Sequence, residues 1–111
     1  MMRQGVAVYF AVGAVDLRGA FDRLAGITQQ VLGLEPASGA LFLFVNRRKN
    51  RLKALWWDRN GYTILYKRLS KGTFKIVHPP ASKAAYVEIS AADFALLIAG
   101  LPLGASSDSL H

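Results

Sequence analysis

The sequence predicts an α+β domain, an antiparallel β-meander packed by an N-terminal amphipathic helix and a short C-terminal helix. Two observations carry this prediction. Apolar residues recur at helical spacing near the N-terminus, and short apolar segments separated by turn residues fill the middle of the chain. The 111 residues suit one domain, and no repeat or linker divides them. We expect the domain to span residues 1–103 and residues 104–111 to form a disordered tail.

The N-terminal part predicts a strand and then a helix. The run Val6–Val15 is rich in β-favouring residues, and we interpret it as a buried strand rather than the core of a signal peptide. Asp16 is a good N-cap, and Gly33 suits the residue after a helix. Between them lies an apolar stripe at spacings of three and four residues, formed by Leu17, Phe21, Leu24, Ile27 and Val31.

Four strands are predicted next, each bounded by turn residues: Leu41–Val45, Leu52–Trp57, Tyr62–Arg68 and Thr73–Val77. The first is wholly apolar, which is typical of a strand buried on both faces. The Asn-Gly pair at 60–61 is a strong hairpin signal. Pro79 and Pro80 interrupt the pairing because neither can donate a ladder hydrogen bond. A short edge strand at Ala85–Ile89 is expected after them.

The last predicted element is a helix that starts at Ser90. Ser90 is a favourable N-cap, and Asp93 three residues later makes a variant of the capping box. A buried stripe is expected, made of Phe94, Leu97, Ile98 and Leu101.

Positive charge is concentrated in one segment. Residues 47–75 contain ten of the fourteen Lys and Arg residues and a single acid, Asp58, so this stretch carries +9. The remaining four cations face six acids, which gives −2. Aromatic residues are interleaved with the cations. Because cations neutralise phosphates and exposed rings can stack on unpaired bases, this pattern favours a surface that binds nucleic acid.

The alternative is that the segment is a solvated face whose lysines protect edge strands from aggregation. Acids would then be mixed with the cations, as they are elsewhere in the chain. Trp56 and Trp57 point to opposite faces of a strand, and Trp57 shares its face with Lys53, so Trp57 is the better candidate for an exposed ring. The alternative is that both rings pack in the core or at an interface. The candidate nucleic-acid-binding residues are Arg18, Arg47, Arg48, Lys49, Arg51, Lys53, Trp57, Lys67, Arg68, Lys71 and Lys75.

Catalytic and metal-binding patterns are weak in this sequence. There is no cysteine, and the two histidines, His78 and His111, have no ligand-like spacing. The acids lie at expected caps and turns rather than in a cluster. We therefore expect a non-enzymatic protein without a cofactor or metal site. No apolar run approaches the length of a membrane span, so a cytoplasmic protein without membrane contact is expected.

Several segments together resemble a known family. Residues 16–24, DLRGAFDRL, resemble a D-(M/L)-R-x-x-F-x-x-L motif, and residues 43–58, LFVNRRKNRLKALWWD, resemble F-x-x-R-R-x-x-x-x-K-x-L-x-W-D. Gly61, the Lys67-Arg68-Leu69 triplet, Gly72 and Phe74 then match its G…K-R-L-x-x-G-x-F continuation. The family is that of TnpB-type accessory proteins, the second open reading frame of insertion-sequence-sixty-six elements. The resemblance covers roughly residues 6 to 101.

The resemblance implies an accessory protein of DNA transposition, encoded beside a separate transposase. Its implied partners are DNA and that transposase. The chain departs from the family where an acid is usual in the first hairpin, since Asn50 and Arg51 stand there, and where an aromatic is often found, since Ile76 and Val77 stand there. A second interpretation stays open, in which the chain is a protein–protein interaction module that docks on the transposase or forms a homodimer without binding DNA.

Overall fold

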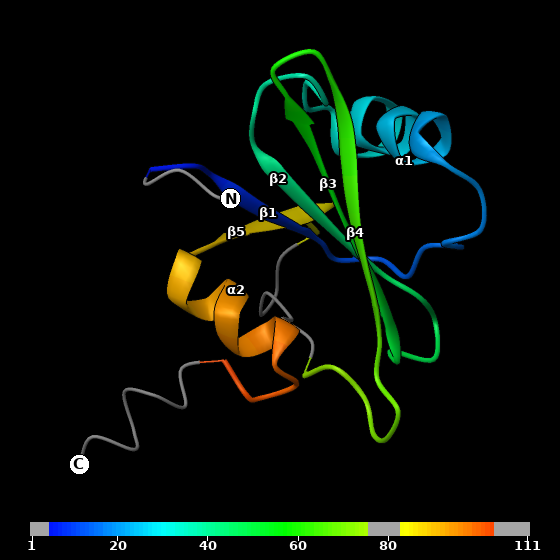
Figure 1. Cartoon of the computed structure of the whole chain (residues 1–111), viewed down its shortest axis with the longest axis vertical. Coiled ribbons are helices and arrows are strands. Elements are labelled where there is room, and N and C mark those ends of the chain that lie inside the picture. The colour runs from blue at the N-terminus through cyan, green and yellow to red at the C-terminus, as the bar shows by residue number, and fades with distance from the viewer. Residues whose placement is uncertain (1–4, 76–82, 104–111) are drawn as a thin grey trace.

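Strands from both ends of the chain meet in one mixed sheet. The structure is a computed structural model that describes residues 5–75 and 83–103. Within these residues the sheet has five strands in the order β4-β3-β2-β1-β5 (Figure 1). Their bounds are Val8–Ala11 for β1, Leu41–Val45 for β2, Arg51–Asp58 for β3, Gly61–Arg68 for β4 and Tyr86–Ile89 for β5.

The predicted α+β class is confirmed, and so is the meander, because β2, β3 and β4 are consecutive antiparallel neighbours. β1 adds a feature that the meander alone does not include. It pairs parallel with β2 and antiparallel with β5, and so lies inside the sheet. β5 matches the predicted edge strand at Ala85–Ile89.

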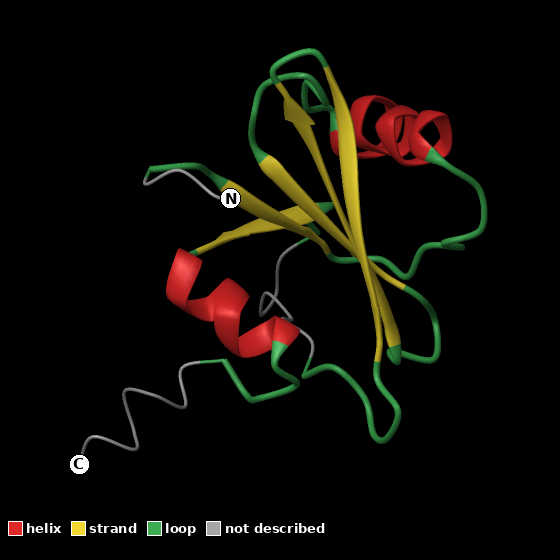
Figure 2. Ribbon diagram, in the orientation of Figure 1, coloured by secondary structure: helices red, strands yellow, loops and turns green. Residues whose placement is uncertain are grey.

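Two helices cover opposite faces of the sheet (Figure 2). The helix α1 (Phe21–Ile27) contributes Leu24 to the core on one face, and α2 (Ala91–Ile98) contributes Leu97 to the core on the other. Every residue of β2 is buried because its side chains alternate between these two cores. The wholly apolar sequence of this strand predicted that double burial.

The first helix begins later in the chain than an N-cap at Asp16 would place it. Its N-cap is Ala20, which makes no side-chain capping bond. Gly19 lies between Asp16 and the helix with φ +92°, a left-handed conformation that a continuous right-handed helix does not contain. The prediction that Asp16 caps this helix is therefore wrong.

The end of the helix also differs from the predicted stripe. After Ile27 the chain widens into one π-helical turn, η1 (Thr28–Leu32). The buried positions become Leu24, Thr28 and Leu32, a period of four, whereas Val31 is 63 % exposed. The buried Thr28 hydroxyl donates to the Leu24 carbonyl at 2.8 Å, so its polar atom is satisfied. Gly33 ends the turn at φ +72°, as predicted.

The segment predicted as a strand at Thr73–Val77 is not one in its described part, residues 73–75. Gly72, at φ +76°, turns the chain, and the buried Phe74 side chain then enters the core beneath α2. Ile76 and Val77, the Pro79-Pro80 pair and the predicted tail 104–111 lie outside the described residues.

The C-terminal helix agrees with its predicted cap. The Ser90 hydroxyl accepts a hydrogen bond from the Asp93 backbone N–H at 3.0 Å. Leu101, predicted to be buried with Leu97, lies beyond the helix and is 50 % exposed. No helix in the described part of the chain is long and apolar enough to cross a membrane.

Candidate nucleic-acid interface

The topology gathers most of the segment's positive charge at one end of the sheet. Arg51, the first residue of β3, pairs with Arg68, the last residue of β4, so the β2–β3 hairpin and the chain that follows β4 meet there (Figure 1, lower end). Of the ten cations in residues 47–75, only Arg59 lies in the turn at the opposite end. We call the other nine the basic end: Arg47, Arg48, Lys49, Arg51, Lys53, Lys67, Arg68, Lys71 and Lys75.

The tip of the β2–β3 hairpin is held by one side chain, Asn46. Its Oδ1 accepts hydrogen bonds from the backbone N–H groups of Asn50 at 3.1 Å and Arg51 at 3.0 Å. Its Nδ2 donates to Asn50 Oδ1 at 2.9 Å. These bonds fix a turn from which the Arg47 and Arg48 side chains are exposed to solvent.

The chain after β4 is tied to the same hairpin through its backbone. The Leu69 N–H donates to the Asn50 carbonyl at 2.9 Å, and the Phe74 N–H donates to the Lys49 carbonyl at 2.7 Å. The loop that carries Lys71 is therefore anchored at both ends to the hairpin tip.

A third segment, residues 14–18, crosses the sheet beside the hairpin, and we call it the strap. The Val15 N–H donates to the Val45 carbonyl at 2.9 Å, and the Leu17 side chain is buried. The Lys53 ammonium then donates to the carbonyls of Leu17 at 2.6 Å and Gly19 at 3.1 Å. Lys53 thus uses one N–H donor on the strap and a second on Gly19, the residue that follows it.

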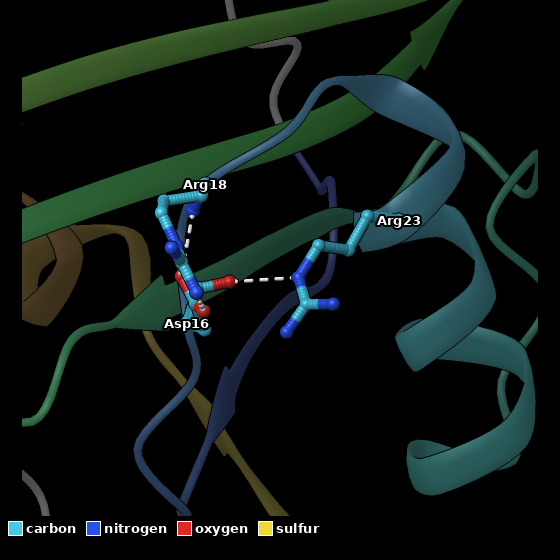
Figure 3. Close-up of polar contacts among 3 residues, drawn as sticks. All are labelled: Asp16, Arg18 and Arg23. Atoms are coloured by element: carbon cyan, nitrogen blue, oxygen red, sulfur yellow. Dashed lines mark hydrogen bonds and ion pairs between the residues drawn. The ribbon is translucent and has the colours of Figure 1, made fainter.

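Asp16 organises the two arginines next to it (Figure 3). The Arg18 guanidinium forks onto the Asp16 carboxylate, with Nη2 to Oδ2 at 2.7 Å and Nε to both oxygens at 3.0 Å. The Arg18 N–H also donates to Asp16 Oδ1, and Arg23 Nε donates to the Asp16 carbonyl at 2.9 Å. These Arg18 hydrogen bonds hold the pKa of the Asp16 carboxyl far below its usual range, and Asp16 in turn raises the pKa of Arg18.

The strap and the hairpin enclose a cleft of about 550 Å³. Five cations line it against one carboxylate, Asp16, and the aromatic ring in its lining is Tyr66. Tyr66 faces Lys53 across the β3–β4 pair, with the ammonium 5.3 Å from the ring centroid, and remains 51 % exposed. We call this the basic cleft, whose charged and aromatic lining is Asp16, Arg18, Arg47, Arg48, Arg51, Lys53 and Tyr66.

Comparison with known proteins identifies the family. Residues 6–107 match the family described as "IS66 Orf2 like protein". The chain belongs to this family. The resemblance seen in its motifs is confirmed, and the family associates the chain with transposition.

Two similar proteins come from Sinorhizobium fredii (strain NBRC 101917 / NGR234). "Uncharacterized protein y4hO" is 40 % identical over 98 residues, which cover 88 % of this chain and 83 % of that protein. "Uncharacterized protein y4jC" is 32 % identical over 98 residues, which cover 88 % of this chain and 81 % of that protein. No solved structure matches the chain.

The D-L-R motif of this IS66 Orf2-like protein builds one wall of the basic cleft. Asp16 binds Arg18, and Leu17 enters the core on the α1 face. Leu24, at the end of the motif, is buried in the same core, but Phe21 is 43 % exposed. The first three residues of the motif therefore belong to the strap, and its last four form the start of α1.

Some predicted residues of this IS66 Orf2-like protein lie apart from the cleft. Lys49, Arg68, Lys71 and Lys75 share the basic end but do not line the cleft. Lys67 Nζ donates to the carbonyl of Ile98, the last residue of α2. A positive charge at this C-terminal end of the helix is stabilised by the helix dipole.

Trp57 is not brought together with the cations of the basic end. It lies four residues along β3 from Lys53, a separation of about 13 Å at the usual strand rise. Its ring packs edge-on against the Tyr62 ring, with the two ring centroids 5.0 Å apart. Its Nε1 donates a hydrogen bond to the Arg59 carbonyl at 3.1 Å. Trp56 packs against the core on the α2 face, on the other side of the strand.

Tyr66 is the aromatic residue at the cleft that the sequence prediction missed. A sequence signal for it exists, because strand alternation and the tight turn at Arg59-Asn60 place it opposite Lys53. Within residues 5–75 and 83–103, no three acids or histidines gather into a group that could hold a metal ion.

Proposed function

We propose that this protein is a non-catalytic accessory factor of DNA transposition that binds DNA phosphates through its basic end, with low sequence specificity. The observation that carries the proposal is the gathering of nine cations at one end of the sheet. In the described part of the chain, none of the nine forms an ion pair with an acid. Phosphate contacts give affinity that depends on salt but carry no base code.

The alternative of a plain solvated face explains this arrangement less well. Arg51 and Arg68 are direct cross-strand partners, and like charges in that position destabilise a sheet. A surface that only keeps the protein soluble would gain from an acid at either position. The repulsion is relieved when a polyanion binds, which supports a phosphate-binding role.

The test is a salt titration of binding to a fluorescently labelled duplex, followed by anisotropy. We expect the logarithm of affinity to fall linearly with the logarithm of salt concentration. A double variant, Arg47→Gln with Arg48→Gln, should weaken binding and lower the slope by about one unit for each phosphate that is no longer bound. The control is Arg59→Asn, which removes a cation from the far end and should change neither. Binding that is absent at low salt, or insensitive to salt, overturns the proposal.

One observation favours the second candidate function, docking on the transposase or on a second copy of the chain. β4 is an edge strand of eight residues with no neighbour on its outer side among the described residues. Such an edge can accept a strand from another chain. Pull-down with the transposase after nuclease treatment separates the two functions. A complex that survives nuclease favours docking, and a complex that dissociates favours a DNA bridge.

The arrangement of acids supports the non-catalytic part of the proposal. Strand transfer by two metal ions needs several carboxylates that converge on one point. Asp16 is engaged by Arg18, and Asp58 lies beside the turn at the far end of β3. Purified protein should not nick supercoiled DNA with Mg²⁺ or Mn²⁺, whereas product should increase when it is added to the transposase. Nicking by the protein alone that disappears in Asp58→Asn would contradict this part.

A further inference from the structure

The basic cleft combines three features that an open, positively charged surface does not. It is concave, it contains an aromatic ring that is half exposed, and three of the arginines in its lining have no carboxylate partner among the described residues. We infer that the basic cleft holds one unpaired nucleotide of single-stranded DNA, with the base on Tyr66 and the phosphate at Arg47, Arg48 and Arg51. This inference rests on the proposed function and assigns the form of DNA that this site selects.

Tyr66 is placed to act as a stacking platform. Its position opposite Lys53 in the β3–β4 pair puts it on the cleft face of the sheet. The Lys53 ammonium lies 5.3 Å from the ring centroid and is itself held by the Leu17 and Gly19 carbonyls. The Lys53 ammonium, held in this way, helps to keep the Tyr66 ring in place. The exposed part of the ring surface remains available for a base to stack on. Base–aromatic stacking of this kind tolerates any base sequence.

The four arginines that line the cleft differ in what their guanidinium groups can still bind. Arg18 has its fork occupied by Asp16, so it completes the wall of the cleft. Arg47, Arg48 and Arg51 have no carboxylate partner among the described residues, and all three are exposed. A guanidinium without a partner presents a planar pair of donors that matches a phosphate.

Duplex DNA cannot use this ring, and that distinguishes the two forms of DNA. Inside a duplex, away from its two ends, both faces of each base are covered by neighbouring bases, so a base there reaches an aromatic platform only when it is unpaired or flipped out. The volume of about 550 Å³ lies within the range of small-ligand sites and is suited to one nucleotide rather than a helix. The basic end outside the cleft, with Arg68, Lys71 and Lys75, remains available to phosphates of either form.

The experiment compares a labelled 20-nucleotide single strand with a duplex of equal length, at one salt concentration. The variant is Tyr66→Val, which keeps a β-favouring residue and removes the ring. We expect its affinity for the single strand to fall about five- to 150-fold, the equivalent of about 1–3 kcal/mol. Its affinity for the duplex and its salt slope should not change. Tyr66→Phe should retain the single-strand affinity, because stacking needs the ring and not the hydroxyl.

The matched control is Trp57→Leu, which removes an aromatic residue from the same face of β3 at the far end and should leave single-strand binding intact. Equal loss for both forms of DNA in Tyr66→Val, or none for either, overturns the inference while leaving the proposed function standing. Absence of salt-dependent binding in the unmodified protein overturns the proposed function instead.

A second measurement does not depend on any variant. Photo-crosslinking of a single strand that contains 5-bromodeoxyuridine should attach the base at Tyr66, located by mass spectrometry. Crosslinks confined to Trp57 or Tyr62 would overturn the assignment.

Discussion

Arg51 and Arg68 face each other directly across β3 and β4, two exposed cations with no carboxylate bound to either within the described residues. Opposite charges that face each other directly across two paired strands normally stabilise the sheet, and like charges destabilise it. The pair is therefore a position where stability and phosphate binding make opposite demands.

Replacing one member of the pair should separate these two demands. Arg68→Gln is expected to raise the free energy of unfolding slightly, on the order of 0.3 kcal/mol at low salt, because the exposed repulsion is removed. The same change should weaken DNA binding and lower its salt slope by about one unit. Urea denaturation and anisotropy check the two effects. Arg59→Asn, which removes one charge from the far turn, should show neither, and a variant that gains affinity would contradict the prediction.

Asp16 should stabilise the strap while opposing phosphate binding. The Asp16→Asn variant keeps an oxygen for the Arg18 N–H but loses the carboxylate that holds the guanidinium. We expect a lower melting temperature and tighter DNA binding, because Arg18 is released and the cleft loses its one negative charge. Binding that weakens in step with stability would show that the strap must be ordered before the cleft can act.

The stability difference between wild type and Asp16→Asn should shrink as the pH becomes more acidic. Because the folded-state pKa of Asp16 lies below the ordinary value of 3.8, its contribution is complete above that value and declines as the pH falls below it. Melting temperatures of the two proteins should therefore differ by a constant amount from pH 7 to pH 5 and converge in stronger acid. A difference that persists unchanged in acid would contradict the ion-pair explanation.

Lys53 should contribute more to stability than an exposed lysine of the basic end. Lys53→Met keeps most of the aliphatic stem but removes the ammonium from the Leu17 and Gly19 carbonyls, at a cost of about 1.5–3 kcal/mol for a charged hydrogen-bonding group. Lys71→Met, in the exposed loop, is the matched control and should be nearly neutral. The denaturant midpoints of the two variants measure these changes in stability. Equal effects would mean that the strap does not depend on Lys53.

Two glycines near the first helix should respond to alanine in opposite directions. At both positions an alanine Cβ would have no atom within 4 Å beyond its chain neighbours and the backbone of its own helix, so packing does not decide the outcome. Gly33 has φ +72°, where alanine is strained by roughly 1–2 kcal/mol. Gly26 lies inside α1, where alanine should stabilise by roughly 0.5–1 kcal/mol. Thermal unfolding of Gly33→Ala and Gly26→Ala tests the pair, and the same sign for both would contradict it.

The strands could be predicted because their burial follows directly from local pattern. The apolar run Leu41–Val45 and the alternation in β3 both specify which face each side chain occupies. The start of α1 could not be predicted, because Asp is a residue type favoured at N-caps and only the folded structure shows that Asp16 binds Arg18 instead. Nor could the exposure of Val31, since a single π-helical turn shifts every later residue of the stripe.

The site was partly predictable for a similar reason. The charge count locates the basic end, because hairpin connections bring cations near in sequence to the same edge of a sheet. It does not locate the cleft, which needs the strap from the N-terminal part of the chain. Alternation favours Trp57 because it shares a face with Lys53, but a shared face says nothing about position along the strand. Tyr66 is both on that face and directly opposite Lys53.

The hydrogen bonds from Leu69 to Asn50 and from Phe74 to Lys49 have a consequence for the thermodynamics of association. Loops that carry cations usually lose conformational freedom when they close on a ligand, and this loss subtracts from affinity. Here the two loops are already joined through their backbones, so most of that ordering is complete before any ligand arrives. Association should then show a small entropic penalty, and the amide protons of Leu69 and Phe74 should exchange slowly in the free protein.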